Sequence, residues 1–171
     1  MQNSITNDQL IGYVADQFRR TYFKGIPRLH NDDGAFLSFT CCLMATESLG
    51  GFLKPKGGNG ERFRNFVESY FPDPLCNQSE TLWKFRNAMV HAVSPGPYAL
   101  THNHRNLHLT TNDGRTVLNA EDFYDAFVHA TERYFNALSK DAALQALFLE
   151  RTNDPKTGIM VVIQATSKSH P

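Results

Sequence analysis

The stretch that decides the fold runs from Ala35 to Leu53 and reads AFLSFTCCLMATESLGGFL. Its apolar side chains fall on most sides of a helix, and a helix with that pattern lies deep in a bundle. Its one charged residue is Glu47. An ionisable group among apolar neighbours needs a partner, so we expect another side chain of the fold to meet Glu47.

Helical spacing of apolar residues continues on both sides of this stretch. On the N-terminal side, Thr6-Asn7-Asp8-Gln9 is a capping-box pattern, which predicts a helix that reaches about Phe23. On the C-terminal side, the spacing predicts a short helix over residues 63–71, a fourth helix from the cap at 77–80 to about 93, and a last long helix from 119 towards 149. The expected fold class is therefore mainly α, a bundle of about five helices.

The hydrophobic period changes between residues 104 and 118. Residues 105–110 and 115–118 flank Asn112-Asp113-Gly114, and such a turn predicts a β-hairpin inserted in the bundle. Residues 158–163 are also β-prone and are expected to add a C-terminal strand. We find no repeat or second domain, so we expect one helical domain over residues 1–165 and a flexible tail at 166–171.

The composition fits one globular domain. The chain has 171 residues, of which 41% are hydrophobic, and 17 Lys+Arg balance 17 Asp+Glu. A neutral total gives no bulk attraction to nucleic acid, so any such contact needs a local basic patch. Continuous apolar runs fall short of the roughly 20 residues of a membrane helix. We also expect no signal peptide, and Cys41, Cys42 and Cys76 are an odd set that suits reduced thiols, so the predicted location is the cytoplasm.

Residues 82–91, LWKFRNAMVH, carry the most chemical information. On a helical wheel, Arg86, Asn87 and His91 share an arc beside the side chains expected to face the core. A guanidinium can hold a phosphate by two hydrogen bonds, and an imidazole can take or give a proton near neutral pH. An amide can orient the imidazole or the ribose. RNA supplies its own nucleophile, the 2′-hydroxyl, so these groups could act on it without a metal.

The run Arg86-Asn87-Ala88-Met89-Val90-His91 resembles the R-x4-6-H motif of HEPN domains, and the helices around it resemble their layout. The resemblance implies a bundle that forms a homodimer through the motif helix. For many members it implies a metal-independent endoribonuclease that needs no cofactor and leaves 2′,3′-cyclic phosphate ends. Such enzymes belong to toxin–antitoxin or phage-defence systems, where an antitoxin or regulatory protein is a partner. Other members are catalytically silent and bind a nucleotide or a protein.

Matched by position to that motif, Arg86 and His91 take the place of the catalytic pair, and Asn87 that of the auxiliary polar residue. Glu47 corresponds to an acidic residue that some members place on an earlier helix. The alternative leaves no chemistry at this point: Arg86 pairs with Glu47 inside the fold, and His91 caps the helix C-terminus. Basic residues expected to contact RNA phosphates are Lys54, Lys56, Arg62, Arg64 and Arg105.

His102, His104 and His108 are a second candidate group. Residues at i and i+2 of a strand lie on one face, and three histidines can bind zinc with an open coordination position. No carboxylate is placed nearby as a base. We therefore expect a polar hairpin edge and no metal here, with a zinc site as the alternative.

Overall fold

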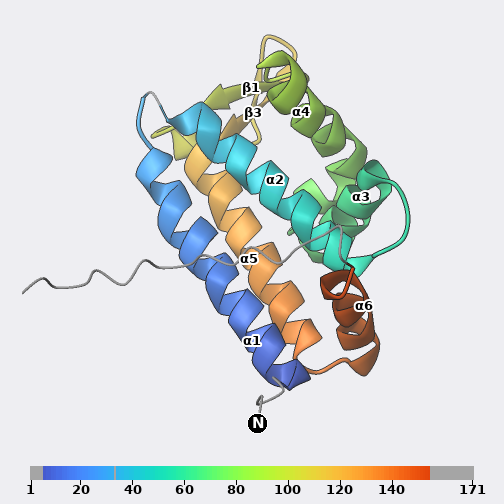
Figure 1. Ribbon diagram of the computed structural model, residues 1–171. Helices are drawn as coiled ribbons and strands as arrows, with labels where there is room; N and C mark the ends of the chain where they lie inside the picture. Colours follow the sequence, from blue (N-terminus) through green and yellow to red (C-terminus); the bar gives the residue numbers. More distant parts are fainter. Residues whose placement is uncertain (1–5, 33, 155–171) are drawn as a thin grey trace, which may run out of the picture.

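The computed structural model describes residues 6–32 and 34–154 (Figure 1). In that part of the chain, six α-helices share one core, and a small sheet lies beside one end of the bundle. The expected mainly α bundle with an inserted β-hairpin is confirmed. The helices are α1 (Asn7–Phe18), α2 (Ala35–Leu53), α3 (Asn59–Tyr70), α4 (Ser79–Ala92), α5 (Ala120–Leu138) and α6 (Ala142–Thr152).

α2 is the central helix and contacts α3, α4, α5 and α6. Its inner face is buried, but Leu37 and Met44 on its outer face are 53% and 50% exposed. The prediction that this helix lies deep in the bundle is thus correct for one side only. Within the described residues, α2 is also the one helix long and apolar enough to cross a membrane, and half of it is buried in the fold. Small polar residues interrupt its apolar runs. The length of continuous apolar runs therefore did not identify α2 as a helix that could cross a membrane.

The predicted Asp-Gly hairpin is present. β2 (Thr111–Asn112) pairs antiparallel with β3 (Arg115–Asn119), and Asp113 and Gly114 both have positive φ, 49° and 74°, as the tightest hairpin turns require. The first strand is shorter than expected, because Arg105–Leu107 form a 3-10 turn. A further strand, β1 (Tyr98–Thr101), pairs parallel with β3, and the sheet order is β1-β3-β2. The strand predicted at 158–163 and the tail at 166–171 lie outside the described residues.

The predicted last long helix is two helices. α5 starts where expected, with the Asn119 side chain accepting the N–H of Asp122 at 3.1 Å. It ends at Leu138, and Asp141 caps a new helix by accepting the N–H groups of Ala143 and Leu144 at 2.8 and 3.2 Å. No glycine or proline marks this break, so the helical spacing of apolar residues continues across it and predicts a single helix. The break lets α6 turn back against α2.

Candidate active site

The core packing of α4 sets the direction of its functional face. Phe85 is fully buried, and its ring centroid lies 5.8 Å from that of Phe39 on α2 and 6.4 Å from that of Phe123 on α5. The next residue, Arg86, is directed towards α2, where its Nη2 lies 2.6 Å from Oε2 of Glu47. The two side chains are 15% and 17% exposed, which makes this the most buried ion pair among the described residues.

The Arg86 guanidinium also meets the other two residues of the motif. Its Nη1 donates to Oδ1 of Asn87 at 3.2 Å and lies 3.4 Å from Nε2 of His91. Its Cζ lies 5.4 Å from the ring centroid of Trp83, within cation–π range. The structure therefore brings Arg86, Asn87, His91 and Glu47 together in one place.

The alternative reading of the motif, a purely structural role, also predicts that Arg86 pairs with Glu47. Two observations distinguish the observed pair from an ion pair that is closed off inside the fold. His91 is exposed, so an imidazole faces solvent directly beside the guanidinium. Nε of Arg86 is buried without a hydrogen-bond partner among the described residues, so the pairing leaves one donor of this guanidinium unused.

A hollow of about 240 Å³ opens beside this pair, and we call it the arginine pocket. Three guanidinium groups face one carboxylate there, so positive charge is in excess. Burial and the nearby charge of Arg62 lower the pKa of Arg151, against the opposite effect of Asp154, whose Oδ2 lies 4.0 Å from Arg151 Nη1. The lining comes from four helices: Met44, Glu47 and Ser48 of α2, Asn59 and Arg62 of α3, Arg86 of α4 and Arg151 of α6.

The five basic residues expected to contact phosphate are divided by the structure. Arg62 lines the arginine pocket and donates to the carbonyl of Pro55, in the loop that carries Lys54 and Lys56. Arg105 makes its contacts elsewhere, with α5. Its Nη1 lies 3.0 Å from Oδ1 of Asp122 and 2.9 Å from Oδ2 of Asp125. Arg105 thus pairs with two carboxylates of α5, and the structure does not bring it to the arginine pocket. The others pair with single acids: Lys54 with Glu61, Lys56 with Glu150 at 3.3 Å, and Arg64 with Glu80 at 3.2 Å.

Sequence reasoning missed Arg151 and Asn59. Arg151 stands near the end of α6, remote in sequence from the motif, and its helix could not be separated from α5 by pattern. Asn59 is the first residue of α3, in a stretch that reads as a flexible glycine-rich loop. Neither residue carries a local signal; only the packing of α3 and α6 on α2 brings both to the arginine pocket.

The three histidines of the metal alternative have separate surroundings. His102 Nε2 lies 2.9 Å from Oδ1 of Asp32, and His108 Nδ1 accepts the N–H of Asn119 at 3.1 Å, whereas His104 is exposed. Across residues 6–32 and 34–154, no three His, Cys, Asp or Glu side chains are placed to hold a metal ion. The geometry thus gives the zinc alternative no support.

His108 sets a pH dependence of stability that can be measured. Burial lowers its pKa, and Nδ1 must stay unprotonated to accept the Asn119 N–H. The unfolded chain therefore takes up this proton at higher pH than the folded chain does. We expect the free energy of unfolding to fall as the pH drops below about 6.5, the value for an unfolded histidine.

Urea titrations at pH values above and below this point check the expectation. The variant His108→Asn keeps an acceptor for the Asn119 N–H but has no titrating ring, so its stability should vary less with pH. Some dependence should remain, because burial also lowers the pKa of His30. An identical pH dependence in the variant and the wild type contradicts the assignment to His108.

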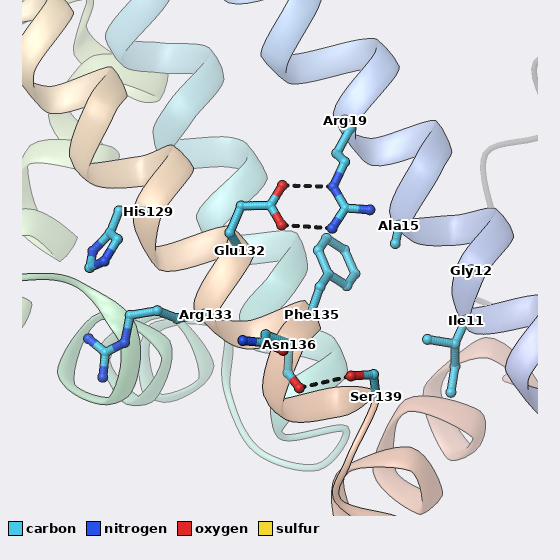
Figure 2. A pocket seen from close by; sticks show the side chains of 10 residues that line it. All are labelled: Ile11, Gly12, Ala15, Arg19, His129, Glu132, Arg133, Phe135, Asn136 and Ser139. Atoms are coloured by element: carbon cyan, nitrogen blue, oxygen red, sulfur yellow. Dashed lines mark hydrogen bonds and ion pairs between the residues drawn. The ribbon is translucent and has the colours of Figure 1, made fainter.

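A larger hollow, of about 480 Å³, lies between α1 and α5 (Figure 2). Arg19 donates to both carboxylate oxygens of Glu132 at 2.7 Å, and this pairing lowers the pKa of Glu132. Figure 2 shows His129 and Arg133 on the opposite side of Glu132 from Arg19. The polar groups do not converge on one point, and the central charge is already matched. The arginine pocket, where positive charge is in excess, is therefore the stronger candidate site.

Comparison with known proteins adds no relative: no family model, no curated protein and no solved structure matches this chain.

Proposed function

We propose that this chain is a metal-independent endoribonuclease of the HEPN type that acts as a homodimer. The observation that carries the proposal is the contact of one guanidinium, Arg86, with both Asn87 and His91, beside a pocket in which positive charge is in excess. This arrangement offers the two things that cleavage of RNA requires of a protein. They are a cation that holds the phosphate and a group that moves protons.

In the proposed reaction, His91 takes the proton of a ribose 2′-hydroxyl, and the 2′-oxygen attacks the adjacent phosphorus. The bond from phosphorus to the 5′-oxygen of the next nucleotide breaks, and that oxygen receives a proton. The products are a 2′,3′-cyclic phosphate and a 5′-hydroxyl. Arg86 holds the phosphate and stabilises the charge that develops on its oxygens, while Asn87 orients the groups. Glu47 is a positioning residue, because it touches Arg86 at 2.6 Å.

A homodimer fits this reaction because two proton transfers occur on opposite sides of the phosphorus. One histidine accepts the proton of the nucleophile, and a second one, from the other copy, can supply the proton of the leaving oxygen. One strip of Arg86 and His91 is also open on one side, since His91 is exposed. Two strips related by a twofold axis would form a cleft between them.

The surface beside the motif supports such an interface. Four large apolar side chains are exposed on the neighbouring helices α2 and α4 and just beyond α4: Leu37 at 53%, Met44 at 50%, Val90 at 36% and Val93 at 76%. We call them the apolar face, and we propose that they lie together on the dimer surface. Val93 also has a φ of 48°, which costs a β-branched residue about 1–2 kcal/mol. Contact with a second copy would bury the Val93 side chain and offset the cost of this backbone conformation.

The dimer can be tested by placing charge on the apolar face. We expect the wild type to have the mass of a dimer in light scattering, and the variants Met44→Glu and Val90→Glu to have the mass of a monomer. Both positions are exposed in the single chain, so folding should be retained. Leu107→Glu is the matched control, because Leu107 is 40% exposed but lies in the 3-10 turn outside this face. A monomeric wild type, or variants that remain dimeric, would refute the proposed interface.

The activity is tested by incubating the purified protein with mixed-sequence RNA in excess EDTA. We expect fragments to accumulate, because no step in the reaction uses a metal. RNA that stays intact in EDTA and in magnesium buffer contradicts the proposal. Cleavage that needs magnesium contradicts the metal-independent mechanism and with it the catalytic roles of Arg86 and His91.

The second candidate is a catalytically silent HEPN-like module that binds a nucleotide or a protein partner. The observation that favours it is the burial of Arg86, which is 15% exposed and already paired with Glu47. Calorimetry separates the two: this candidate predicts nucleotide binding, or a copurifying partner, without turnover of RNA. For either candidate we propose a cytoplasmic setting, which suits the three free cysteines. An antitoxin or another regulatory protein is the proposed partner.

A further inference from the structure

We infer that the arginine pocket binds a phosphate monoester or free phosphate, held chiefly by Arg62 and Arg151. The chemistry common to these ligands is a small tetrahedral dianion. Arg62 and Arg151 belong to α3 and α6 and lie outside the Arg86–His91 motif, so phosphate binding by them does not depend on cleavage of RNA.

The charge distribution in the pocket favours an anion. Three guanidinium groups come together around one carboxylate, and that carboxylate is already paired with Arg86 at 2.6 Å. Arg62 and Arg151 are two like charges that line one hollow, and like charges repel. Burial, and then the charge of Arg62, lower the pKa of Arg151. Asp154 Oδ2 lies 4.0 Å from Arg151 Nη1. A bound dianion would turn this repulsion into attraction, because both cations would then face the same negative group.

Hydrogen-bond donors remain for such a ligand. Nε of Arg62 and Nε of Arg86 are both buried and have no hydrogen-bond partner among the described residues. Buried donors are nearly always paired in folded proteins, so the unpaired Nε of Arg62 points to a missing acceptor, whereas Nε of Arg86 belongs to a guanidinium that already pairs with Glu47. Asn59 and Ser48 line the same hollow and can add neutral donors.

One of the arginines, Arg62, is also held in place before any ligand arrives. The Arg62 Nη2 group donates to the carbonyl of Pro55, which fixes that side chain against the loop after α2. Arg151 lies against Gly51 of α2: a Cβ at this position would be only 3.2 Å from Arg151 Nε and 3.4 Å from Nη2. The lack of a side chain at Gly51 therefore makes the room that Arg151 occupies. A group held as Arg62 is loses little freedom on binding, which favours affinity.

The geometry of the groups favours phosphate over a carboxylate ligand. A guanidinium presents a planar fork that matches two oxygens of a phosphate, and here such forks come from different helices. The oxygens of a tetrahedral anion point in several directions and can meet forks from different helices, whereas the two oxygens of a carboxylate lie in one plane. The volume, about 240 Å³, has room for a phosphate group. A nucleotide or an RNA end could therefore insert its terminal phosphate.

The test is isothermal calorimetry of the full chain with inorganic phosphate at constant ionic strength. We expect saturable binding to the wild type, and an affinity about tenfold or more lower in Arg62→Gln and in Arg151→Gln, since each loses charge-assisted hydrogen bonds. Gly51→Ala is a second kind of variant, which displaces Arg151 without removing its charge, and it should also weaken binding. Arg20→Gln is the matched control, because Arg20 is an exposed arginine paired with Asp16 outside the pocket.

Two further arms identify the source of the phosphate. If adenosine monophosphate binds as tightly as inorganic phosphate and adenosine does not bind, the ligand is the terminal phosphate of a nucleotide. If only inorganic phosphate binds, the ligand is the free ion. Both results support the inference. No binding of inorganic phosphate, or binding that both arginine variants retain, overturns it. The variant His91→Ala should bind phosphate as the wild type does, so loss of RNA cleavage and loss of phosphate binding are separate results.

Discussion

RNA cleavage by the His91→Ala variant is expected to be at least about 100-fold slower than cleavage by the wild type, because general acid–base catalysis contributes that much or more. The side chain is exposed at the end of α4, so its removal should leave the fold intact. Lys84→Ala is the matched control, since Lys84 is exposed on the same helix and is not part of the contact set of Arg86. First-order rates under single-turnover conditions, with urea titrations of each variant, give the comparison.

Arg86→Lys tests the role of the guanidinium in catalysis. It does so without leaving the Glu47 carboxylate buried beside no positive charge. Lysine keeps a positive charge near Glu47, but it cannot offer a planar fork to phosphate. We therefore expect the folded state to survive and the cleavage rate to fall, by an amount comparable with that of His91→Ala. A rate unchanged in both Arg86→Lys and His91→Ala, with both variants folded, means that the activity resides elsewhere in the molecule.

Gly50→Ala is expected to lower the free energy of unfolding by about 3 kcal/mol, which is typical of forcing a side chain into a packed interface. α2 and α3 meet closely at this point. A Cβ at Gly50 would lie 2.4 Å from the carbonyl oxygen of Arg62 and 2.7 Å from its carbonyl carbon. These are backbone atoms of a helix, so the two helices would have to separate to admit the methyl group.

The adjacent residue provides the control for this expectation. A Cβ at Gly51 would meet only the end of the Arg151 side chain, at 3.2 Å or more, and that side chain can move. Alanine also favours helix over glycine by up to about 1 kcal/mol. Gly51→Ala should thus be close to neutral in urea titrations. Equal losses at the two positions contradict the close contact of α2 and α3 at Gly50.

The motif could be predicted because it is local. Residues one turn apart on a helix lie on neighbouring positions of its surface, so spacing predicts that Asn87 and His91 lie together and that Arg86 flanks the same arc. The long Arg86 side chain then reaches His91, with Nη1 3.4 Å from Nε2. The partner of Glu47 could also be anticipated, since a buried carboxylate needs a cation. Periodicity likewise predicted α2 and the hairpin around Asp113-Gly114, because each depends on neighbouring residues in the chain.

The arginine pocket could not be predicted, because it depends on packing between distant segments. Arg151 reaches it only because the chain breaks between Leu138 and Ala142, at a point without glycine or proline, and α6 then packs on α2. The exposed face of α2 was missed for a related reason: an apolar helix gives no indication of which side remains uncovered. The partners of Arg105 could not be predicted either, because both lie on α5, beyond the hairpin.

The most direct measurement compares one RNA with a copy of the same sequence in which every 2′-hydroxyl is methylated, both incubated with the wild-type protein in excess EDTA. The proposed mechanism predicts that the unmodified RNA is cut and the methylated copy is not. It also predicts that mass spectrometry finds 2′,3′-cyclic phosphate on the new 3′ ends. Equal cleavage of the methylated copy, or ends that carry a 5′-phosphate and a free 3′-hydroxyl, would contradict attack by the ribose and with it the roles of Arg86 and His91.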